Sequence, residues 1–422
     1  MRTANRELMR EWNTKLILGL IRKQEVTSQV GISKTSGLSV GTVASITGQL
    51  KREGFIKTLG RGKSNGGRKP VVLCFNSEAR YVISVALFAS ETRIAILDLT
   101  GHIMRRISFP TQPERGKEVV FNNTRDRIEG LVAESSIDRN KIAALCVGFE
   151  GSVNGDTGSL IFSVHFGWRD VPVRSTLEGM LNLKTLVESE GRSMALGEYW
   201  FGAGKKASNM VCVDIDAGIG AAIVLDGKIY RGHHQMEGEI GHTIALADGP
   251  FCNCGKAGCL ETIASGSAIL KRIKELTVQS GDRAVSAGAG HPVDRQAIRQ
   301  IFQRAEAGDR VAGQVIRTAG HYLGLAIAGV ANYADPELVV LTGYVSEEDT
   351  GILLRTIRES FQKAVLSENL RKIDVVRGEL GKDAVLIGAA ALAYQELFTL
   401  FQGSSGERRL SLSSPCFLPL CR

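Results

Sequence analysis

The sequence lacks long apolar runs, both along its length and in its first residues, which include several charged side chains. No run of about 18 or more apolar residues occurs, which excludes a helix that spans a membrane. Charged residues interrupt any apolar stretch at the start of the chain, so we expect no secretory signal and a cytoplasmic protein. These residues are Arg2, Arg6, Glu7, Arg10 and Glu11.

Cysteines are also few, at eight in 422 residues, yet three of them lie within residues 252–259. In a reducing compartment this clustering favours a metal site over disulfide bridges. The remaining composition, 43% hydrophobic and 23% charged, is typical of a soluble globular protein. The length is too great for one ordinary core, so we expect two or three domains.

Excess positive charge is confined to the first part of the chain. Residues 1–70 contain 14 of the 52 Lys and Arg but only 4 of the 44 Asp and Glu. The net charge is therefore +10 in this segment and −2 in the rest of the chain. Such segregation is typical of a nucleic-acid interface, and a solvated basic face is the alternative.

The first eighty residues follow the helix-turn-helix pattern. A first amphipathic helix is predicted around an apolar stripe of Leu16, Ile17, Leu20 and Ile21. Ser28 is expected to cap a second helix, and Gly37 to break the chain after it. Ser39 is then expected to cap a third helix over Val40–Glu53. Two short helices joined by a glycine-containing turn form a helix-turn-helix, in which the later helix reads the DNA major groove.

Polar and small side chains face outward early in the third predicted helix, where hydroxyls and a Gln can bond to base edges. The expected base-contacting residues are Ser39, Val40, Gly41, Thr42, Ser45 and Gln49. Two strands, Phe55–Leu59 and Val71–Phe75, predict a hairpin wing after this helix. Its glycine-rich loop carries cations suited to phosphates or the minor groove, namely Arg61, Lys63, Arg68 and Lys69. A small helical domain with a loose basic loop is the alternative.

From Tyr81 onward, strands, glycine turns and helices alternate, which predicts an α/β class. A strand pair over Val82–Leu87 and Arg93–Leu97 is expected to be closed by Asp98–Gly101. Further strands are expected over Ala143–Phe149, Asn209–Asp214, Ala221–Val224 and Leu338–Thr342, with helices over Arg295–Ala305 and Val311–Ala331.

His242, Cys252, Cys254 and Cys259 offer one imidazole and three thiolates in one short segment. This ligand set predicts a tetrahedral Zn²⁺ site that is structural, because no position remains for a water molecule. Gly255 and Gly258 would let the backbone fold tightly enough for the sulfurs to converge. Buried cysteines without a metal are the alternative.

Several of these segments resemble the ROK family of repressors, open reading frames and sugar kinases. The N-terminal matches are Gly37-Leu-Ser-Val-Gly-Thr-Val43 and Gly66-Gly-Arg-Lys-Pro70, with Lys69 inserted and with Val40-Gly41 departing from relatives. The family signature is matched by Gly238-Glu-Ile-Gly-His-Thr243 and by the cysteine segment ending in Leu260-Glu261. Other matching segments are Gly148–Gly151, Gly167–Pro172, Asp335-Pro336 and Leu386–Ala390.

The resemblance implies a two-lobed, actin-like fold with a sugar between the lobes, lined by Glu239, His242 and Glu261. It implies that Glu188-Ser-Glu-Gly-Arg192 stands where kinases carry a catalytic Asp flanked by Asn residues, so Ser189, Glu190 and Arg192 are also expected at the effector. Arg192 favours either an acidic sugar or a salt bridge to Glu188 or Glu190.

The resemblance also implies that catalysis is lost. The first phosphate loop of the kinases corresponds to Ala86-Leu-Phe-Ala-Ser90, whose side chains obstruct close approach of a phosphate. The second corresponds to Asp216-Ala-Gly-Ile-Gly220, which alone is also consistent with a tight hairpin turn. We therefore expect a sugar-responsive repressor of carbohydrate-metabolism genes, and an ATP-dependent sugar kinase carrying a DNA-binding domain is the alternative.

These expectations divide the chain into domains. A winged helix-turn-helix over 1–80 precedes a first lobe over 81–200, to which a helix over 384–402 returns, and a second lobe with zinc over 201–383. Residues 403–422 are rich in Ser, Gly and Pro and are expected to be disordered. The expected partners are double-stranded operator DNA, a sugar or sugar derivative, and one or three further copies of the chain.

Overall fold

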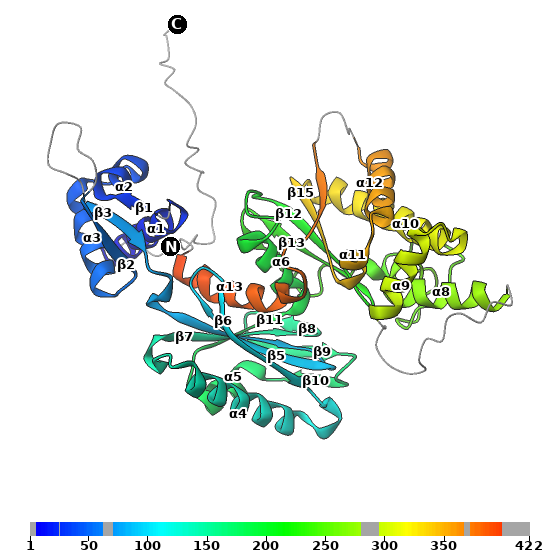
Figure 1. Cartoon of the computed structure of the whole chain (residues 1–422), viewed down its shortest axis with the longest axis horizontal. Coiled ribbons are helices and arrows are strands. Elements are labelled where there is room, and N and C mark those ends of the chain that lie inside the picture. The colour runs from blue at the N-terminus through cyan, green and yellow to red at the C-terminus, as the bar shows by residue number, and fades with distance from the viewer. Residues whose placement is uncertain (1–5, 25, 62–70, 280–294, 367–371, 399–422) are drawn as a thin grey trace, which may run out of the picture. The chain divides into compact units, whose positions relative to one another are not determined.

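The computed structural model describes residues 6–24, 26–61, 71–279, 295–366 and 372–398 (Figure 1). The chain forms two compact units, one of Met1–Phe75 with Leu397–Arg422 and the other of Asn76–Glu396. None of the described helices is long and apolar enough to cross a membrane. The predicted tail, 403–422, lies outside the described residues.

The N-terminal unit contains three helices and a three-stranded sheet of order β1-β3-β2. Its elements are α1 (Arg6–Gln24), β1 (Val26–Ser28), α2 (Gln29–Ser36), α3 (Val40–Arg52), β2 (Ile56–Arg61) and β3 (Val71–Phe75). The predicted caps are confirmed, because the Ser28 hydroxyl accepts from the Gly31 amide and the Ser39 hydroxyl accepts from the Thr42 amide. Between them, α2 ends at Gly37, whose φ of 72° is left-handed.

One apolar face of each helix closes the core of this unit. Ile17 and Ile21 of α1, Ile32 of α2, and Val43 and Leu50 of α3 are almost fully buried. Strands β2 and β3 pair antiparallel, which confirms the predicted hairpin. Its loop, residues 62–70 with Lys63, Arg68 and Lys69, lies outside the described residues.

The first sheet of the larger unit has five strands in the order β11-β7-β4-β5-β6. Its elements are β4 (Tyr81–Leu87), β5 (Glu91–Asp98), β6 (Ile103–Pro110), β7 (Ile142–Phe149) and β11 (Thr185–Ser189), with α4 (Lys117–Ser135) and α5 (Val173–Leu181) on one face. A smaller sheet joins β8 (Ser152–Asn154), β9 (Ser159–Ser163) and β10 (Trp168–Val171). Helix α13 (Ala384–Phe398) returns to the first sheet, where Ser84 Oγ donates to Leu386 O at 2.6 Å.

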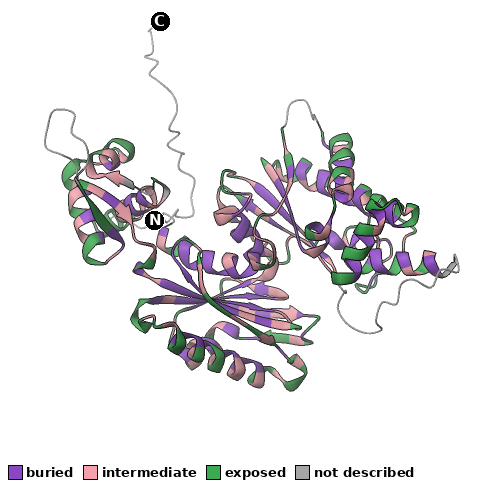
Figure 2. Cartoon of the chain, viewed as in Figure 1, coloured by how far each residue is buried: buried purple, intermediate pink, exposed green. Residues whose placement is uncertain are grey.

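The second sheet also has five strands, in the order β14-β13-β12-β15-β16. The strands are β12 (Met210–Ile215), β13 (Ile219–Leu225), β14 (Lys228–Ile229), β15 (Leu338–Thr342) and β16 (Asp374–Arg377). The helices of this part are α6 (Glu190–Phe201), α7 (Glu261–Ala264), α8 (Gly266–Gln279), α9 (Arg295–Glu306), α10 (Arg310–Ala334), α11 (Tyr344–Glu348) and α12 (Ile352–Ala364). Figure 2 shows the buried residues following the strands of both sheets.

The two sheets share a plan, because the central strand of each pairs antiparallel with the next strand and parallel with a later one. Parallel pairing joined through helices confirms the α/β class. One sequence expectation was wrong. The turn at Asp98–Gly101 joins β5 to β6, and the β4–β5 hairpin closes instead through Phe88–Ser90.

Candidate functional sites

The N-terminal end of α3 is the exposed face of the N-terminal unit that sequence analysis assigned to DNA. Ser39, Val40, Gly41 and Ser45 are exposed, and Thr42 is half-buried. Ser39 Oγ lies 2.9 Å from Thr42 Oγ1 as well as capping the helix. The start of the helix is therefore fixed by its own hydroxyls, and its side chains face solvent.

Gln49, one turn beyond Ser45, already has two partners. Its Oε1 accepts from Arg10 Nη2 of α1 at 3.0 Å, and its Nε2 donates to Glu53 Oε1 at 2.8 Å. Sequence analysis did not single out Arg10 for this role, because the two residues lie on different helices. Arg61 is the last residue of β2 and is the one predicted wing cation within the described residues.

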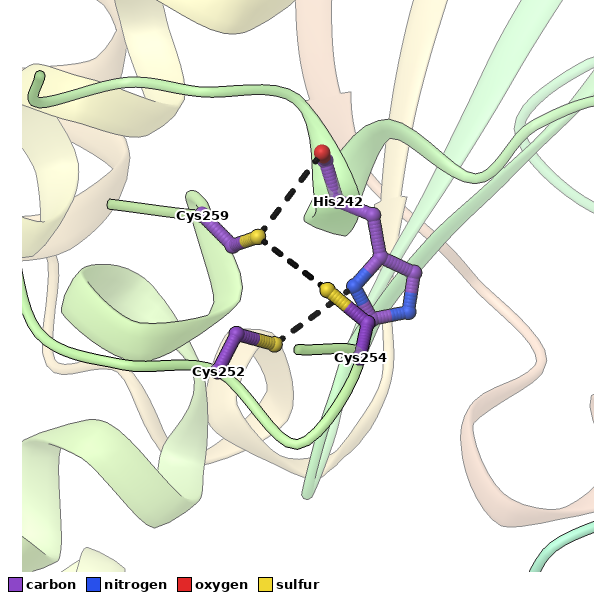
Figure 3. A group of neighbouring side chains, drawn as sticks. All are labelled: His242, Cys252, Cys254 and Cys259. Atoms are coloured by element: carbon purple, nitrogen blue, oxygen red, sulfur yellow. Dashed lines mark hydrogen bonds between the residues drawn. The ribbon is translucent and has the colours of Figure 1, made fainter. Parts of the chain in front are cut away.

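The four predicted metal ligands converge (Figure 3). One ligand atom from each of His242, Cys252, Cys254 and Cys259 lies within 4.8 Å of all the others, so the group could hold a metal ion. Cys252 Sγ is 3.7 Å from His242 Nδ1, and Cys254 Sγ is 3.6 Å from Cys259 Sγ. A tetrahedron with Zn–S bonds of about 2.3 Å has ligand–ligand edges of about 3.8 Å. The two printed spacings are therefore close to the edges of such a tetrahedron.

The backbone around the cysteines explains how three sulfurs reach one point. Gly255 and Gly258 have φ of 87° and 77°, a region that favours glycine. A Cβ at Gly258 would overlap the Leu246 carbonyl oxygen. The pKa of Cys254 is lowered, first by a hydrogen bond from the Lys256 backbone, which favours the thiolate that a metal requires. Desolvation and the neighbouring thiols instead raise the pKa of Cys259 to about 12, so this thiol would need the charge of a bound metal to ionise.

Glu239, His242 and Glu261 lie beside this centre. His242 Nε2, the ring nitrogen not directed at Cys252, is 3.9 Å from Glu239 Oε2. Glu261 Oε2 accepts from the Ile219 amide at 3.3 Å, in the turn between β12 and β13. Burial raises the pKa of Glu239, and the charge of Glu261 raises it further. The loop that brings His242 and the three cysteines together thus holds two carboxylates next to a strand turn.

Ser189 and Glu190 begin α6, where the Ser189 hydroxyl accepts from the Arg192 amide. Glu190 Oε2 is buried without a hydrogen-bond partner among the described residues. Burial raises the pKa of Glu190 well above its ordinary value, and the charges of Glu150, Asp214 and Asp216 add to the effect. We name Glu150, Glu190, Asp214, Asp216, Glu239 and Glu261 the acidic cluster.

Glu150 of the acidic cluster is paired with His165, which also senses the charge of Glu261. Glu150 Oε2 accepts from the Ala89 amide at 2.6 Å, and its Oε1 lies 2.7 Å from His165 Nδ1. This contact raises the pKa of His165, and the charge of Glu261 contributes. Glu150 lies in Gly148–Gly151, a segment that resembles the ROK family, but the sequence predicted no role for it.

The Arg192 side chain is part of an ionic network, and each of its guanidinium nitrogen atoms has a partner within the protein. Its Nε is 2.6 Å from Glu188 Oε1, its Nη1 is 2.7 Å from Glu237 Oε1, and its Nη2 donates to the Val153 carbonyl. Arg231 Nη2 is 2.5 Å from the other Glu188 oxygen. This arrangement is the salt-bridge alternative that the sequence left open. Glu237 and Arg231 were missed, because nothing local in the sequence links them to Arg192.

A surface hollow of about 540 Å³ lies elsewhere, along Gly101–Arg106 with Asp383 and Ile387.

Comparison with protein-family models gives two matches. The model described as the ROK family matches residues 82–396, and the model described as winged helix-turn-helix DNA-binding matches residues 13–57. These ranges fall on the larger unit and on the N-terminal unit respectively.

The repressors among the relatives match nearly the whole of this chain, whereas the glucokinase matches a smaller share of it. A xylose repressor of Caldicellulosiruptor bescii is 29% identical, and the match covers 94% of this chain and 98% of the length of the repressor. A glucokinase of Halalkalibacterium halodurans is 31% identical but covers 78% of this chain and 99% of its own. Among solved structures, a ROK family transcriptional regulator, a homologue of the E. coli MLC protein, has a TM-score of 0.80 at 27% identity, covering 93% of this chain and 97% of its own.

Proposed function

Because the chain belongs to the ROK family, we propose that it is a DNA-binding transcriptional repressor that a sugar or sugar derivative releases from DNA. The observation that carries the proposal is the exposed start of α3 within a winged helix-turn-helix. We propose base contacts from Ser39, Val40, Gly41, Thr42, Ser45 and Gln49, and backbone contacts from Arg61, Lys63, Arg68 and Lys69. Carbohydrate-metabolism genes are the proposed targets, and a homodimer or homotetramer the proposed form.

The proposed effector ligands are Ser189, Glu190, Glu239, His242 and Glu261, whose side-chain oxygen atoms and, at His242, ring nitrogen Nε2 suit sugar hydroxyls. Arg192 was part of the set expected from sequence, but its contacts with Glu188 and Glu237 favour a structural role. The proposed metal is a structural Zn²⁺ on His242 and the three cysteines. When bound, it would fix the loop that carries Glu239 and Glu261.

Phosphoryl transfer is not part of the proposed function. That reaction depends on positioning phosphates against backbone amides. In this chain the Ala89 amide of the first loop donates to Glu150, and the Ile219 amide of the second turn donates to Glu261. The Tyr344 hydroxyl and the Asp216 carbonyl both lie close to Gly266, so Tyr344 also lies near the second turn.

A sugar kinase with a DNA-binding domain is the second candidate. The Glu190 Oε2 atom, which has no hydrogen-bond partner among the described residues, favours it, since a carboxylate there could accept a hydroxyl proton. Measuring ATP turnover over a panel of sugars separates the two candidates. Sugar-dependent turnover would establish the kinase, and its absence together with DNA binding supports the repressor.

DNA binding is tested by selecting tight-binding fragments from a random library and measuring their affinity against salt concentration. Arg68→Ala should weaken binding to selected and random DNA about equally and reduce the salt slope by roughly one ion. Arg125→Ala, an exposed residue of α4 in the other unit, is the matched control. A change of preferred sequence at full affinity would assign Arg68 to a base instead.

A further inference from the structure

Residues 231–237 form a strap that connects two points of β13. Before the strap, the Tyr230 amide donates to a carbonyl of β13 at 2.8 Å. After it, the Ala221 amide donates to the Gly238 carbonyl at 2.7 Å, and a Cβ at Gly238 would overlap the Ala221 carbonyl oxygen. Both ends of the strap are therefore fixed to the second sheet. Glu239 follows directly, so the strap leads into the loop that carries proposed effector ligands.

The tip of the strap lies on the turn between β8 and β9 of the smaller sheet. The Gly155 amide donates to Gln235 Oε1 at 2.8 Å, and Gln235 Nε2 donates to Asp156 Oδ2 at 3.1 Å. This turn is itself fixed, because Arg174 of α5 donates to the Asp156 and Gly155 carbonyls at 2.7 and 2.9 Å. A Cβ at Gly155 would come within 2.9 Å of Arg231 Nε, so a glycine here allows the close approach of the strap.

Ion pairs hold the strap to β11 and α6. Glu237 Oε1 accepts from Arg192 Nη1 of α6 at 2.7 Å, and its Oε2 accepts from the Gly232 amide within the strap at 2.8 Å. Arg231 Nη2 is 2.5 Å from Glu188 Oε2, near the end of β11. Glu188 and Arg192 stand on either side of the proposed effector ligands at the start of α6. The strap therefore joins the elements that carry the two groups of proposed effector ligands.

Gln235 has a backbone conformation that is unfavourable for a residue with a side chain. Its φ of 55° lies in the left-handed region, where the Cβ crowds the following carbonyl oxygen. Such a conformation persists where surrounding contacts hold it, and it is common at ligand clamps and switch regions. The side-chain contacts of Gln235 with the β8–β9 turn oppose this cost.

We infer that Gln235 is a positioning residue for the effector, because its contact with the β8–β9 turn sets the spacing between the start of α6 and the loop after Gly238. The inference rests on the proposed sugar response and adds a residue that acts through the strap and not by contact with the ligand. Without this contact, the loop that carries Glu239 and His242 can move relative to α6. Any ligand that needs both groups then binds more weakly.

Amide exchange tests the contact without a sugar. In the full-length, metal-loaded protein, Gln235→Ala should accelerate exchange at the Gly155 amide at least about tenfold, because that amide loses its acceptor. Exchange at the Ala221 amide, where the strap is anchored beside the effector loop, should accelerate at least about threefold. Unchanged exchange at Gly155 would overturn the contact, and unchanged exchange at Ala221 would overturn the positioning role.

Gln112→Ala is the matched control. Gln112 also has a left-handed φ, of 58°, and its side chain also accepts a hydrogen bond, in the loop before α4. This substitution should change exchange at neither Gly155 nor Ala221. If Gln235→Ala does not fold, the exchange measurement is made on Gln235→Gly, which removes the same amide group.

Sugar affinity tests the positioning role. The probes are D-glucose, D-xylose and N-acetyl-D-glucosamine, each screened by thermal shift and measured by calorimetry. Gln235→Ala and Gln235→Gly both remove the amide group, but only the glycine relieves the left-handed backbone. We expect both variants to bind the sugar about fivefold or more weakly than wild type, and Gln235→Gly to have the higher Tm. A purely structural role would make affinity follow stability, so wild-type affinity in Gln235→Gly overturns the inference.

The two measurements separate the inference from the proposed function. Binding by wild type together with unchanged affinity in both variants overturns the inference and leaves the sugar response intact. Wild-type protein that binds none of the probes counts against the proposed sugar response, and exchange at Ala221 then decides the inference.

Discussion

The two large sheets contain matching hairpin turns, Phe88–Ser90 between β4 and β5 and Asp216–Gly218 between β12 and β13. A backbone amide at each turn donates to a glutamate, with N···O distances of 2.6 Å at Ala89 and 3.3 Å at Ile219. The turns thus share one kind of contact, although the first turn contains no glycine and the second contains Gly218.

The two glutamates reach their turns by different means. Glu150 directly follows β7, whose last residue Phe149 pairs in parallel register with Leu87 of β4. The sheet itself therefore positions Glu150. Glu261 stands two residues after Cys259 of the proposed metal site and begins the four-residue helix α7. We therefore expect the first turn to depend on strand pairing and the second on the proposed metal.

Removal of the metal should give the largest difference between the turns. Cys254→Ser is expected to lower the zinc content from about one per chain to near zero and to destabilise the second sheet by several kcal/mol. Amide exchange at Ile219 should accelerate at least tenfold, while exchange at Ala89 stays within about twofold. Metal analysis and hydrogen exchange read out the two effects.

Cys74→Ser in β3 is the matched control, because Cys74 is a free cysteine away from the centre. Equal acceleration at both turns in Cys254→Ser would contradict the comparison. Well under one zinc per chain in unchelated wild-type protein would contradict the metal assignment.

Substitution of the two glutamates should give the next largest effect. Glu261→Gln keeps the shape but removes a charged acceptor, which should cost about 1.5–3 kcal/mol of effector affinity. DNA affinity without effector should not change, so the variant should bind DNA and respond poorly to sugar. Glu150→Gln should change the effector affinity less, because Glu150 is committed to Ala89 and His165.

The measurement is release of operator DNA titrated with the sugar that the thermal screen identifies. Release of DNA from Glu261→Gln at the wild-type sugar concentration would show that the effector binds elsewhere.

Substitution of Asp216 should give the smallest effect, and it depends on pH. Burial and the charges of Asp214, Glu347 and Glu150 raise the pKa of Asp216 to about 8, against 3.8 ordinarily. Between these values the folded protein binds more protons than the unfolded chain, so this group lowers stability as pH rises toward 8. Asp216→Asn removes the effect.

The Tm gain of Asp216→Asn over wild type should therefore be larger at pH 8 than at pH 5, by roughly 2–6 °C. Asp126→Asn, an exposed residue paired with Arg125, should show no such pH dependence. A gain that is the same at both pH values would mean that Asp216 is ionised in the folded protein throughout this range.

The parts that could be predicted from sequence are those built from neighbouring residues. The caps at Ser28 and Ser39 act within one helical turn, and the His and three Cys side chains that converge lie within residues 242–259. Strand β6 was not predicted, because edge strands carry exposed charge that hides their apolar alternation, and Arg105 and Arg106 do so here.

The partners of Arg192 show where such reasoning stops. Glu188 is four residues away, near the end of β11, so the sequence offered it as a partner. Glu237 and Val153 come from distant segments that only the tertiary fold brings to the guanidinium. The choice between a ligand contact and an internal ion pair therefore needed the structure.

The hydrogen bonds of Gln49 have a consequence for the base contact that we propose for it. Because Arg10 and Glu53 hold its amide before DNA arrives, a contact between Gln49 and a base exchanges one set of partners for another. The correct base then adds little net affinity, since the bonds formed replace bonds lost. At a wrong base, Gln49 would lose its hydrogen bonds to Arg10 and Glu53 without gaining new ones. This loss of binding free energy would therefore occur only at incorrect DNA sites. The same exchange frees the Arg10 guanidinium beside the recognition helix, where a phosphate can take the place of Gln49.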